Sequence, residues 1–188
     1  MSPNDKIKLF KEATIKFNNK HNLISKKNTD KIIEEAIEEA IALTEHLKQN
    51  KNILDIGTGS GLPGIPLAIF NEDKNIFLSE KNNKKNYHLK KTVRALGIKN
   101  ATTIGPSNKK TKINKKIDCV VSKAFASTKK TIEITNSFLE KPFTLMLLKG
   151  KLETINEEIT EANITKENYE IIKIQNEKEK HILKIRNE

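Results

Sequence analysis

The chain has 188 residues and a formal net charge of +11, a length typical of one domain with a substantial buried core. It has no run of about 18 apolar residues, so no membrane-spanning helix is expected, and its first residues lack the apolar core of a signal peptide. Cys119 is the only cysteine, which excludes an internal disulfide and a cysteine zinc site and favours the cytoplasm.

The positive charge is concentrated in one segment. Residues 81–116 contain twelve Lys or Arg and no Asp or Glu, while the rest of the chain is close to neutral. Such a block is typical of a protein that binds a phosphate-rich partner such as RNA. The alternative is a set of merely solvated lysines, because Lys, Asn and Ile are abundant throughout the chain.

Two helices are expected before the first strand. Apolar residues spaced three to four apart, from Ile7 to Phe17, predict a short amphipathic helix. Asn28 or Thr29 is a suitable cap for a second helix, whose inner face is expected to include Ile33 and Ile41. We assign residues 1–50 to an N-terminal helical extension.

Strands and helices alternate after this extension. The predicted strands are residues 53–56, 76–79, 102–104, 117–122 and 144–148, and the predicted helices are residues 63–70, 83–96 and 128–139. Two further strand-like runs, 169–175 and 181–186, are close enough for an antiparallel hairpin. The pattern predicts an α/β fold, with a mainly parallel sheet, helices on both faces and a C-terminal hairpin, as one compact unit over residues 51–188.

A glycine-rich turn follows the first predicted strand. Gly57, Gly59 and Gly61 lie at alternate positions, where the backbone can turn tightly and approach a ligand closely. The helix that follows offers free N–H groups at its start. Such a turn can hold a pyrophosphate or the amino-acid end of S-adenosylmethionine, and a turn without a ligand is the third possibility.

Two acidic residues help to choose between these ligands. Asp55 lies two residues before Gly57, where its carboxylate would repel a pyrophosphate but can pair with an ammonium group. Glu80 ends a predicted strand about 20 residues after the glycines, a position that suits a ribose diol in either cofactor class. Together they favour S-adenosylmethionine over NAD or FAD.

No side chain stands out as a catalytic base or metal ligand. The four histidines show no metal-ligand spacing, and Cys119 lies in an apolar run typical of a buried strand. We therefore predict neither a metal nor a catalytic side chain. Tyr87 can stack on a base or pack within its helix, and Phe125 can shape a base pocket or pack.

The run from Asp55 to Pro66, Asp-Ile-Gly-Thr-Gly-Ser-Gly-Leu-Pro-Gly-Ile-Pro, resembles the signature of the glucose-inhibited division protein B family. Its members are bacterial methyltransferases that modify N7 of a guanine in 16S ribosomal RNA. Further matches occur in the same order, at residues 22–25, 84–85, 122–127, 148–150 and 180–181. The resemblance implies a Rossmann-like class I methyltransferase that uses S-adenosylmethionine.

The resemblance also implies roles for individual residues. Gly57, Gly59 and Leu62 are expected around the methionine end of the cofactor, and Glu80 at its ribose. Asn108 and Lys109 fall where the family's loop lies against the adenine, and Lys123 falls where the family usually has Arg beside the cofactor. The basic block is expected to contact RNA phosphates through Lys84, Lys85, Lys90 and Lys91.

Three elements depart from the family pattern. The family's Arg-x-Glu element is replaced at residues 106–109 by Pro-Ser-Asn-Lys, and Lys123 lacks the planar donor geometry of Arg. A His-x-x-Asp-Ser element is missing at residues 36–40, which read Ala-Ile-Glu-Glu-Ala.

The sequence thus predicts a methyltransferase acting on N7 of a guanine in 16S ribosomal RNA or in the small ribosomal subunit. The departures keep open a catalytically degenerate RNA-binding or ribosome-associated protein on the same fold. A nicotinamide-dependent oxidoreductase has little support, because Asp55 is badly placed for a pyrophosphate and no proton-relay pair is evident.

Overall fold

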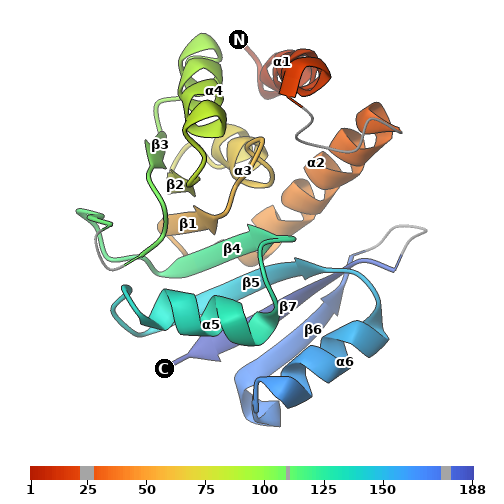
Figure 1. The fold of residues 1–188 in the computed structure, drawn as a ribbon, viewed down its shortest axis with the longest axis vertical. Coiled ribbons are helices and arrows are strands. Elements are labelled where there is room, and N and C mark those ends of the chain that lie inside the picture. The colour runs from red at the N-terminus through yellow and green to blue at the C-terminus, as the bar shows by residue number, and fades with distance from the viewer. Residues whose placement is uncertain (22–27, 109–110, 175–178) are drawn as a thin grey trace.

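The computed structural model describes residues 1–21, 28–108, 111–174 and 179–188. Within these residues, one seven-stranded sheet has the order β3-β2-β1-β4-β5-β7-β6 (Figure 1). Strands β1 to β5 pair with one another in parallel, and β7 is antiparallel to both β5 and β6. The prediction of a mainly parallel α/β sheet with a C-terminal antiparallel hairpin is therefore confirmed. The strands are β1 (Asn52–Ile56), β2 (Asn75–Ser79), β3 (Ala101–Ile104), β4 (Cys119–Lys123), β5 (Phe143–Lys149), β6 (Tyr169–Lys173) and β7 (His181–Asn187).

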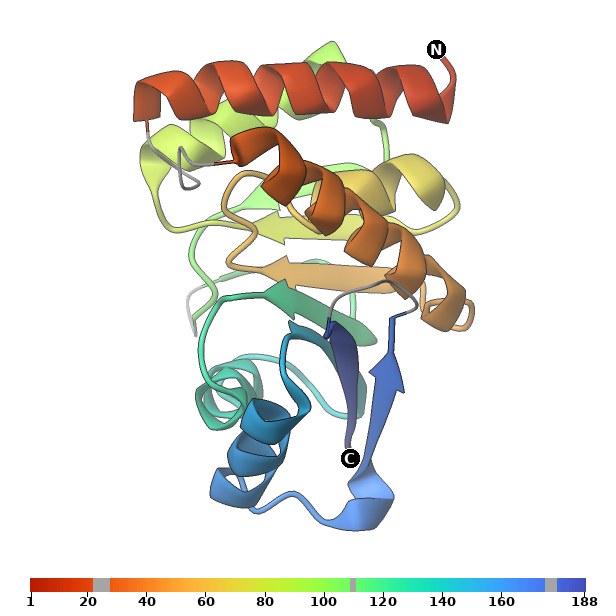
Figure 2. The same cartoon turned by 90° about the vertical axis from the view of Figure 1, so that its right-hand side faces the viewer.

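Helices cover both faces of the sheet, as predicted. On one face, α2, α3 and α4 share a buried cluster with residues of α1. On the other face, α5 and α6 pack over a second cluster that includes Leu54 and Leu145. Figure 2 shows α1 lying across one end of the molecule, beyond α2 and α3. The helices are α1 (Pro3–His21), α2 (Thr29–His46), α3 (Gly64–Phe70), α4 (Asn83–Ala95), α5 (Thr128–Asn136) and α6 (Leu152–Glu161), and a short 3-10 turn, η1 (Lys166–Asn168), precedes β6.

Two details of the helices differ from the sequence analysis. Ile41 does not lie on the inner face of α2; its side chain is 45% exposed, and Leu43 is the buried residue instead. Positions 36, 40, 43 and 47 follow the three-to-four spacing of the buried face, and residue 41 is one step beyond it. Helix α6 was not predicted, although its buried Ile155 and Ile159 have helical spacing.

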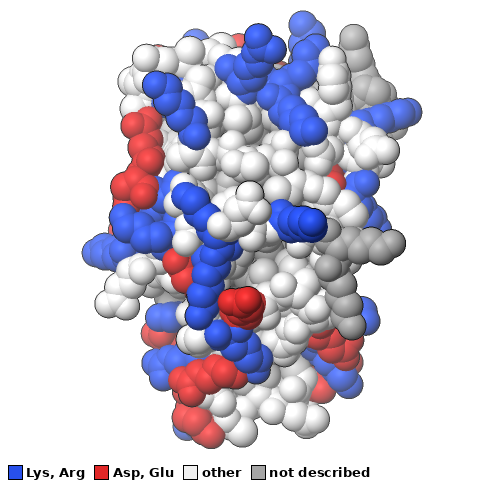
Figure 3. Space-filling model, turned by 90° about the vertical axis from the view of Figure 1, so that its left-hand side faces the viewer, with Lys and Arg blue, Asp and Glu red and all other residues white. Residues whose placement is uncertain are grey.

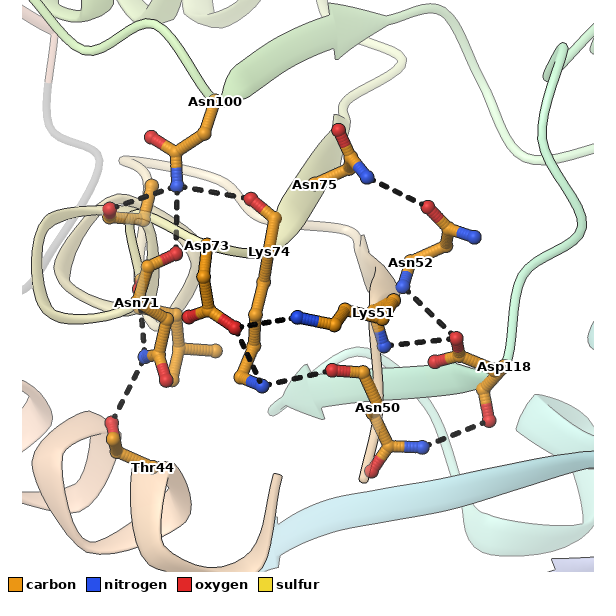
Figure 4. Close-up of polar contacts among 12 residues, drawn as sticks. Thr44, Asn50, Lys51, Asn52, Asn71, Asp73, Lys74, Asn75, Asn100 and Asp118 are labelled. Carbon is orange, nitrogen blue, oxygen red and sulfur yellow. Dashed lines mark hydrogen bonds and ion pairs between the residues drawn. The ribbon is translucent and has the colours of Figure 1, made fainter. Parts of the chain in front are cut away.

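A polar network connects the starts of the parallel strands, at the end of the sheet opposite the glycine turn (Figure 4). The Asp118 carboxylate accepts hydrogen bonds from the backbone N–H groups of Lys51 (2.9 Å) and Asn52 (3.0 Å). The buried Lys74 donates to the Asn50 carbonyl at 2.9 Å. The Asn100 amide donates to three backbone carbonyls at 2.9 to 3.1 Å. These bonds connect the segments that lead into β1, β2, β3 and β4.

Candidate functional site

The glycine turn follows the carboxyl end of β1, and its glycines have left-handed backbone conformations. Gly57, Gly59 and Gly61 have φ values of 70°, 59° and 97°, which side-chain-bearing residues rarely adopt. The Thr58 N–H donates to the Ser79 carbonyl at 3.0 Å, so the turn is tied to the end of β2. The turn leads directly into α3, in the middle of the parallel strands. In open α/β sheets, ligands bind outside the carboxyl ends of the strands.

Asp55 lies beneath this turn and is completely buried. Its Oδ2 accepts hydrogen bonds from the Thr58 hydroxyl (2.5 Å) and from the Gly64 N–H (2.8 Å). Its Oδ1 is buried and has no hydrogen-bond partner among the described residues. Burial raises the pKa of Asp55 to about 7, and the nearby charge of Glu80 acts in the same direction. A cationic ligand beside the unpaired oxygen would stabilise the ionised form of this buried carboxyl group.

Glu80 borders a cleft of about 410 Å³ at the same end of the sheet. Its Oε1 accepts a hydrogen bond of 2.7 Å from the Asn82 N–H, at the cap of α4. The Ser79 hydroxyl donates to the Gly105 carbonyl at 2.9 Å, which holds the loop after β3 against the cleft. The cleft is lined by Gly57, Ser79, Glu80, Lys81, Lys85, Pro106, Ser107, Ala124, Phe125 and Ile134.

Phe125 forms a wall of the cleft directly over the glycine turn. A Cβ added to Gly57 would lie 2.3 Å from Cδ2 of the Phe125 ring, so the ring and this glycine are in close contact. Ala124, beside it, has a left-handed φ of 51° and is exposed. The backbone after β4 is thus bent at the carboxyl end of the strands, where ligands of open α/β sheets bind and where such conformations are common.

Lys123 lines a second pocket, of about 330 Å³, which shares Ala124 with the cleft. The Lys123 ammonium donates a short hydrogen bond to Oε2 of Glu39, a residue of α2 that is 1% exposed. Lys180 Nζ lies 2.8 Å from Oε1 of the same carboxylate. Glu39 therefore joins α2 to the end of β4 and to the start of β7 through two cations.

A similar pair completes the wall of this pocket. Lys149 Nζ lies 2.5 Å from Oε2 of Glu158, which also accepts a hydrogen bond from the Thr128 N–H at 3.1 Å. Burial raises the pKa of Glu158, but the bonds from Lys149 and Thr128 outweigh it and leave that pKa below its usual value. The pocket therefore contains charged groups that are paired with one another.

The structure brings together some of the predicted cofactor residues. Gly57 and Glu80 line the cleft, and Lys123 lines the adjoining pocket. Three other predicted residues do not line the cleft. Asp55 lies beneath the turn, and Gly59 and Leu62 belong to the turn itself. Asn108 is exposed, one residue beyond Ser107 of the cleft, and Lys109 lies outside the described residues.

Sequence reasoning missed Glu39 and Lys180 as members of the site. The signal for Glu39 was present, because it occupies the Asp position of the His-x-x-Asp-Ser element and Lys123 replaces an Arg. An acid and a base that fall at two family positions are a candidate ion pair. The Lys123–Glu39 contact joins residues that are 84 positions apart, so only the fold brings them together.

The four predicted RNA-binding lysines belong to one helix, α4. Lys84, Lys90 and Lys91 are exposed, and Lys85 is half-buried beside the cleft. Figure 3 shows Lys and Arg dominating the upper part of the face on the α4 side, whereas both signs mix in the lower part. The described residues contain neither a cluster of metal-ligating side chains nor a helix able to span a membrane.

The fold has clear relatives among solved structures. The tRNA (m1A58) methyltransferase TrmI from Aquifex aeolicus matches with a TM-score of 0.61 at 14% identity, over 80% of this chain and 68% of that one. The M. jannaschii TYW2 structure in complex with AdoMet matches with a TM-score of 0.52 at 20% identity, over 80% of this chain and 74% of that one. The fold is that of the Rossmann-like class of S-adenosylmethionine-dependent methyltransferases.

Sequence comparison gives the particular family. The model of the GidB family, rRNA small subunit methyltransferase G, matches residues 3–183. A ribosomal RNA small subunit methyltransferase G from Brachyspira hyodysenteriae is 36% identical over 96% of this chain and 90% of its own length. One from Actinobacillus pleuropneumoniae serotype 5b is 41% identical, over 60% of this chain and 54% of its own. The chain belongs to the rRNA small subunit methyltransferase G family, as the sequence motifs predicted.

Proposed function

We propose that the protein transfers the methyl group of S-adenosylmethionine to N7 of a guanine in 16S ribosomal RNA, in the cytoplasm. The observation that carries the proposal is the buried Asp55 carboxylate, whose Oδ1 has no partner among the described residues, beneath a left-handed glycine turn. The family match supplies the class of substrate.

The residues that line the cleft and Asp55 beneath its glycine turn suit the parts of this cofactor. The unpaired Oδ1 of Asp55 accepts a hydrogen bond from the ammonium group, and Glu80, directly after β2, accepts hydrogen bonds from the ribose hydroxyls. Gly57, Gly59 and Leu62 give the turn that surrounds the methionine end. Asn108 and Lys109 stay predicted neighbours of the adenine.

Lys123 is proposed to lie beside the cofactor, as the family resemblance implies. Glu39 holds its ammonium, and Lys180 balances the second oxygen of that carboxylate. The buried carboxylate thereby restricts where the Lys123 charge can move.

The chemistry needs no catalytic base from the chain. The cofactor supplies an electrophilic methyl group on a sulfonium sulfur. Guanine N7 has a free lone pair and no proton to remove, so its lone pair forms the new N–C bond while the C–S electron pair returns to sulfur. The protein therefore contributes positioning, with the reacting atoms in line at about 3–3.5 Å. This is consistent with a cleft lined by Phe125 and glycine backbone.

The basic side chains of α4 are proposed to bind the RNA phosphates. The helix carries Lys84, Lys85, Lys90, Lys91 and Arg94 and no acidic residue. Lys85 also lines the cleft, so the basic face begins at the edge of the proposed reaction site.

The test combines cofactor binding with product mapping. Calorimetric titration with S-adenosylmethionine is expected to give one site, and Asp55→Ala is expected to abolish it. Small subunits from a strain that lacks this methylation then serve as substrate, and borohydride–aniline cleavage locates 7-methylguanine in the product RNA. Methyl transfer to another atom contradicts the N7 assignment. RNA binding without cofactor binding or transfer would instead support the catalytically degenerate alternative.

A further inference from the structure

A groove between α1 and α4 lies outside the cofactor cleft and shares no lining residue with it. Its volume is about 360 Å³. The lining residues are Ala13, Lys16, Phe17, Tyr87, His88, Lys91, Thr92 and Ala95. The floor is mainly apolar and aromatic, two lysines border it, and no acidic residue is among the lining.

Tyr87 is the most unusual residue of this groove. It is 62% exposed and is the one aromatic among the exposed large hydrophobic residues of the described chain. The Lys91 ammonium lies 5.3 Å from the centroid of its ring, in the range of a cation–π contact. An exposed ring beside a cation presents a flat apolar surface together with a site for a phosphate.

The groove also contains a second aromatic pair. The rings of Phe17 and His88 are stacked with centroids 3.9 Å apart and an interplanar angle of 9°. Phe17 belongs to α1 and His88 to α4, so this stack joins the two walls of the groove. The walls are therefore held together by an aromatic contact, and the groove has a defined shape.

The charge around the groove selects the class of ligand. Helix α4 carries five basic residues and no acidic one, and Lys16 adds a cation from the opposite wall. A helix rises about 1.5 Å per residue, so Lys91 lies about 9 Å along α4 from Lys85 at the cofactor cleft. A polyanion bound along α4 can therefore reach both places.

We propose that the α1–α4 groove binds an unstacked base of the RNA substrate, with Tyr87 as the stacking surface and Lys16 and Lys91 at the adjoining phosphates. Single-stranded RNA is bound in this way when basic grooves carry exposed aromatic side chains. The groove thereby anchors the RNA at a second point, away from the reacting guanine. This inference rests on the proposed function, because it takes RNA as the substrate.

Tyrosine fluorescence offers a direct test. The chain has two tyrosines and no tryptophan, so Tyr169→Phe leaves Tyr87 as the only strong intrinsic fluorophore. Titration of this variant with a short oligoadenylate is expected to quench the Tyr87 emission, because a stacked base contacts the ring. Inorganic polyphosphate, which carries charge but no base, is expected to leave the emission nearly unchanged. Equal quenching by both, or none by oligoadenylate, overturns the proposal.

Affinity measurements give the second readout. Tyr87→Ala is expected to weaken oligoadenylate binding about 5- to 100-fold, whereas Tyr87→Phe, which keeps the ring, is expected to stay within about twofold of the parent. An unchanged affinity of Tyr87→Ala overturns the proposal. A loss confined to assembled small subunits, with normal oligoadenylate binding, also overturns it and assigns the groove to a ribosomal protein.

Cofactor titration and methyl transfer by the wild-type protein separate the two ideas. If the wild type transfers the methyl group and Tyr87→Ala keeps the wild-type oligoadenylate affinity, the groove proposal is refuted and the proposed function stands. An inactive wild type refutes the proposed function, while the quenching experiment still decides whether the groove binds a base.

Discussion

Replacing Asp55 by Asn is expected to remove the pH dependence of cofactor binding while leaving the glycine turn intact. The amide oxygen of Asn can still accept the hydrogen bonds from Thr58 and Gly64, which now reach Asp55 Oδ2 at 2.5 and 2.8 Å. Only the negative charge that is proposed to pair with the cofactor ammonium is lost. The variant therefore separates the charge of this residue from its structural role.

The size of the effect follows from the pKa of Asp55, which burial raises to about 7 in the free protein. The bound ammonium favours the ionised carboxylate, so binding at lower pH must release a proton. With a pKa of about 7, the apparent dissociation constant is expected to be about fivefold higher at about pH 6 than at about pH 7. The Asp55→Asn variant is expected to bind more weakly, with a nearly constant affinity over this range.

Calorimetry in buffers of different ionisation enthalpy measures both the affinity and the number of protons released. The comparison stays below about pH 7, because an α-ammonium group has its own pKa near 8. A wild-type affinity that is flat from about pH 6 to pH 7 would refute the reasoning. The same slope in Asp55→Asn would assign the titration to another group.

The same pKa predicts an effect on stability. Because the folded pKa of Asp55 is raised from 3.8 to about 7, the folded state holds the proton more tightly than the unfolded state. The contribution of Asp55 to the unfolding free energy therefore falls as pH rises from about 4 to about 7, by about 4 kcal/mol in total. Urea unfolding of the wild type and Asp55→Asn across this range measures the difference between their slopes.

Three further predictions concern packing, the polar network and RNA binding. Gly64→Ala is expected to lower the unfolding free energy by about 3 kcal/mol, because its Cβ would lie 2.2 Å from Leu78 Cδ2 and 2.5 Å from Asp55 Oδ2. Gly59→Ala, whose Cβ would have its nearest neighbour at 3.8 Å, is expected to lower it by only about 1 kcal/mol, through left-handed backbone strain. Equal losses of the two variants in urea unfolding would contradict this explanation. Asn100→Ala removes the side-chain donor of three carbonyls and is expected to lower the unfolding free energy by about 1–3 kcal/mol in the same assay. Asn114→Ala, at an exposed site, is expected to leave the unfolding free energy nearly unchanged. Equal effects of the two variants would exclude the network as a source of stability. Joint replacement by Ala of the four α4 lysines is expected to reduce the slope of log affinity for RNA against log salt by about three, and an unchanged slope would remove them from the interface. The replaced residues are Lys84, Lys85, Lys90 and Lys91, and the charge-matched control replaces the exposed Lys48, Lys129, Lys151 and Lys166.

The sequence by itself determined the fold class and the glycine turn after β1, because both depend on local patterns. The period of apolar residues distinguished strands from helices, and the succession of elements implied a parallel sheet with a terminal hairpin. The glycines at 57, 59 and 61 have positive φ values, which is the backbone reason for glycine at these positions. Asp55 and Glu80 were placed by their distance from that turn along the chain.

The tertiary structure decided which distant side chains meet. Glu39, Lys123 and Lys180 form one ionic cluster only because the end of β4 and the start of β7 lie near α2, and no local pattern encodes that proximity. The exposure of Tyr87 likewise depends on how α1 packs against α4. The spacing of apolar residues along α4 is by itself equally compatible with a half-buried tyrosine. Local sequence sets the conformation of each element, whereas charge pairing and exposure depend on long-range packing, which a single sequence specifies only through the complete fold.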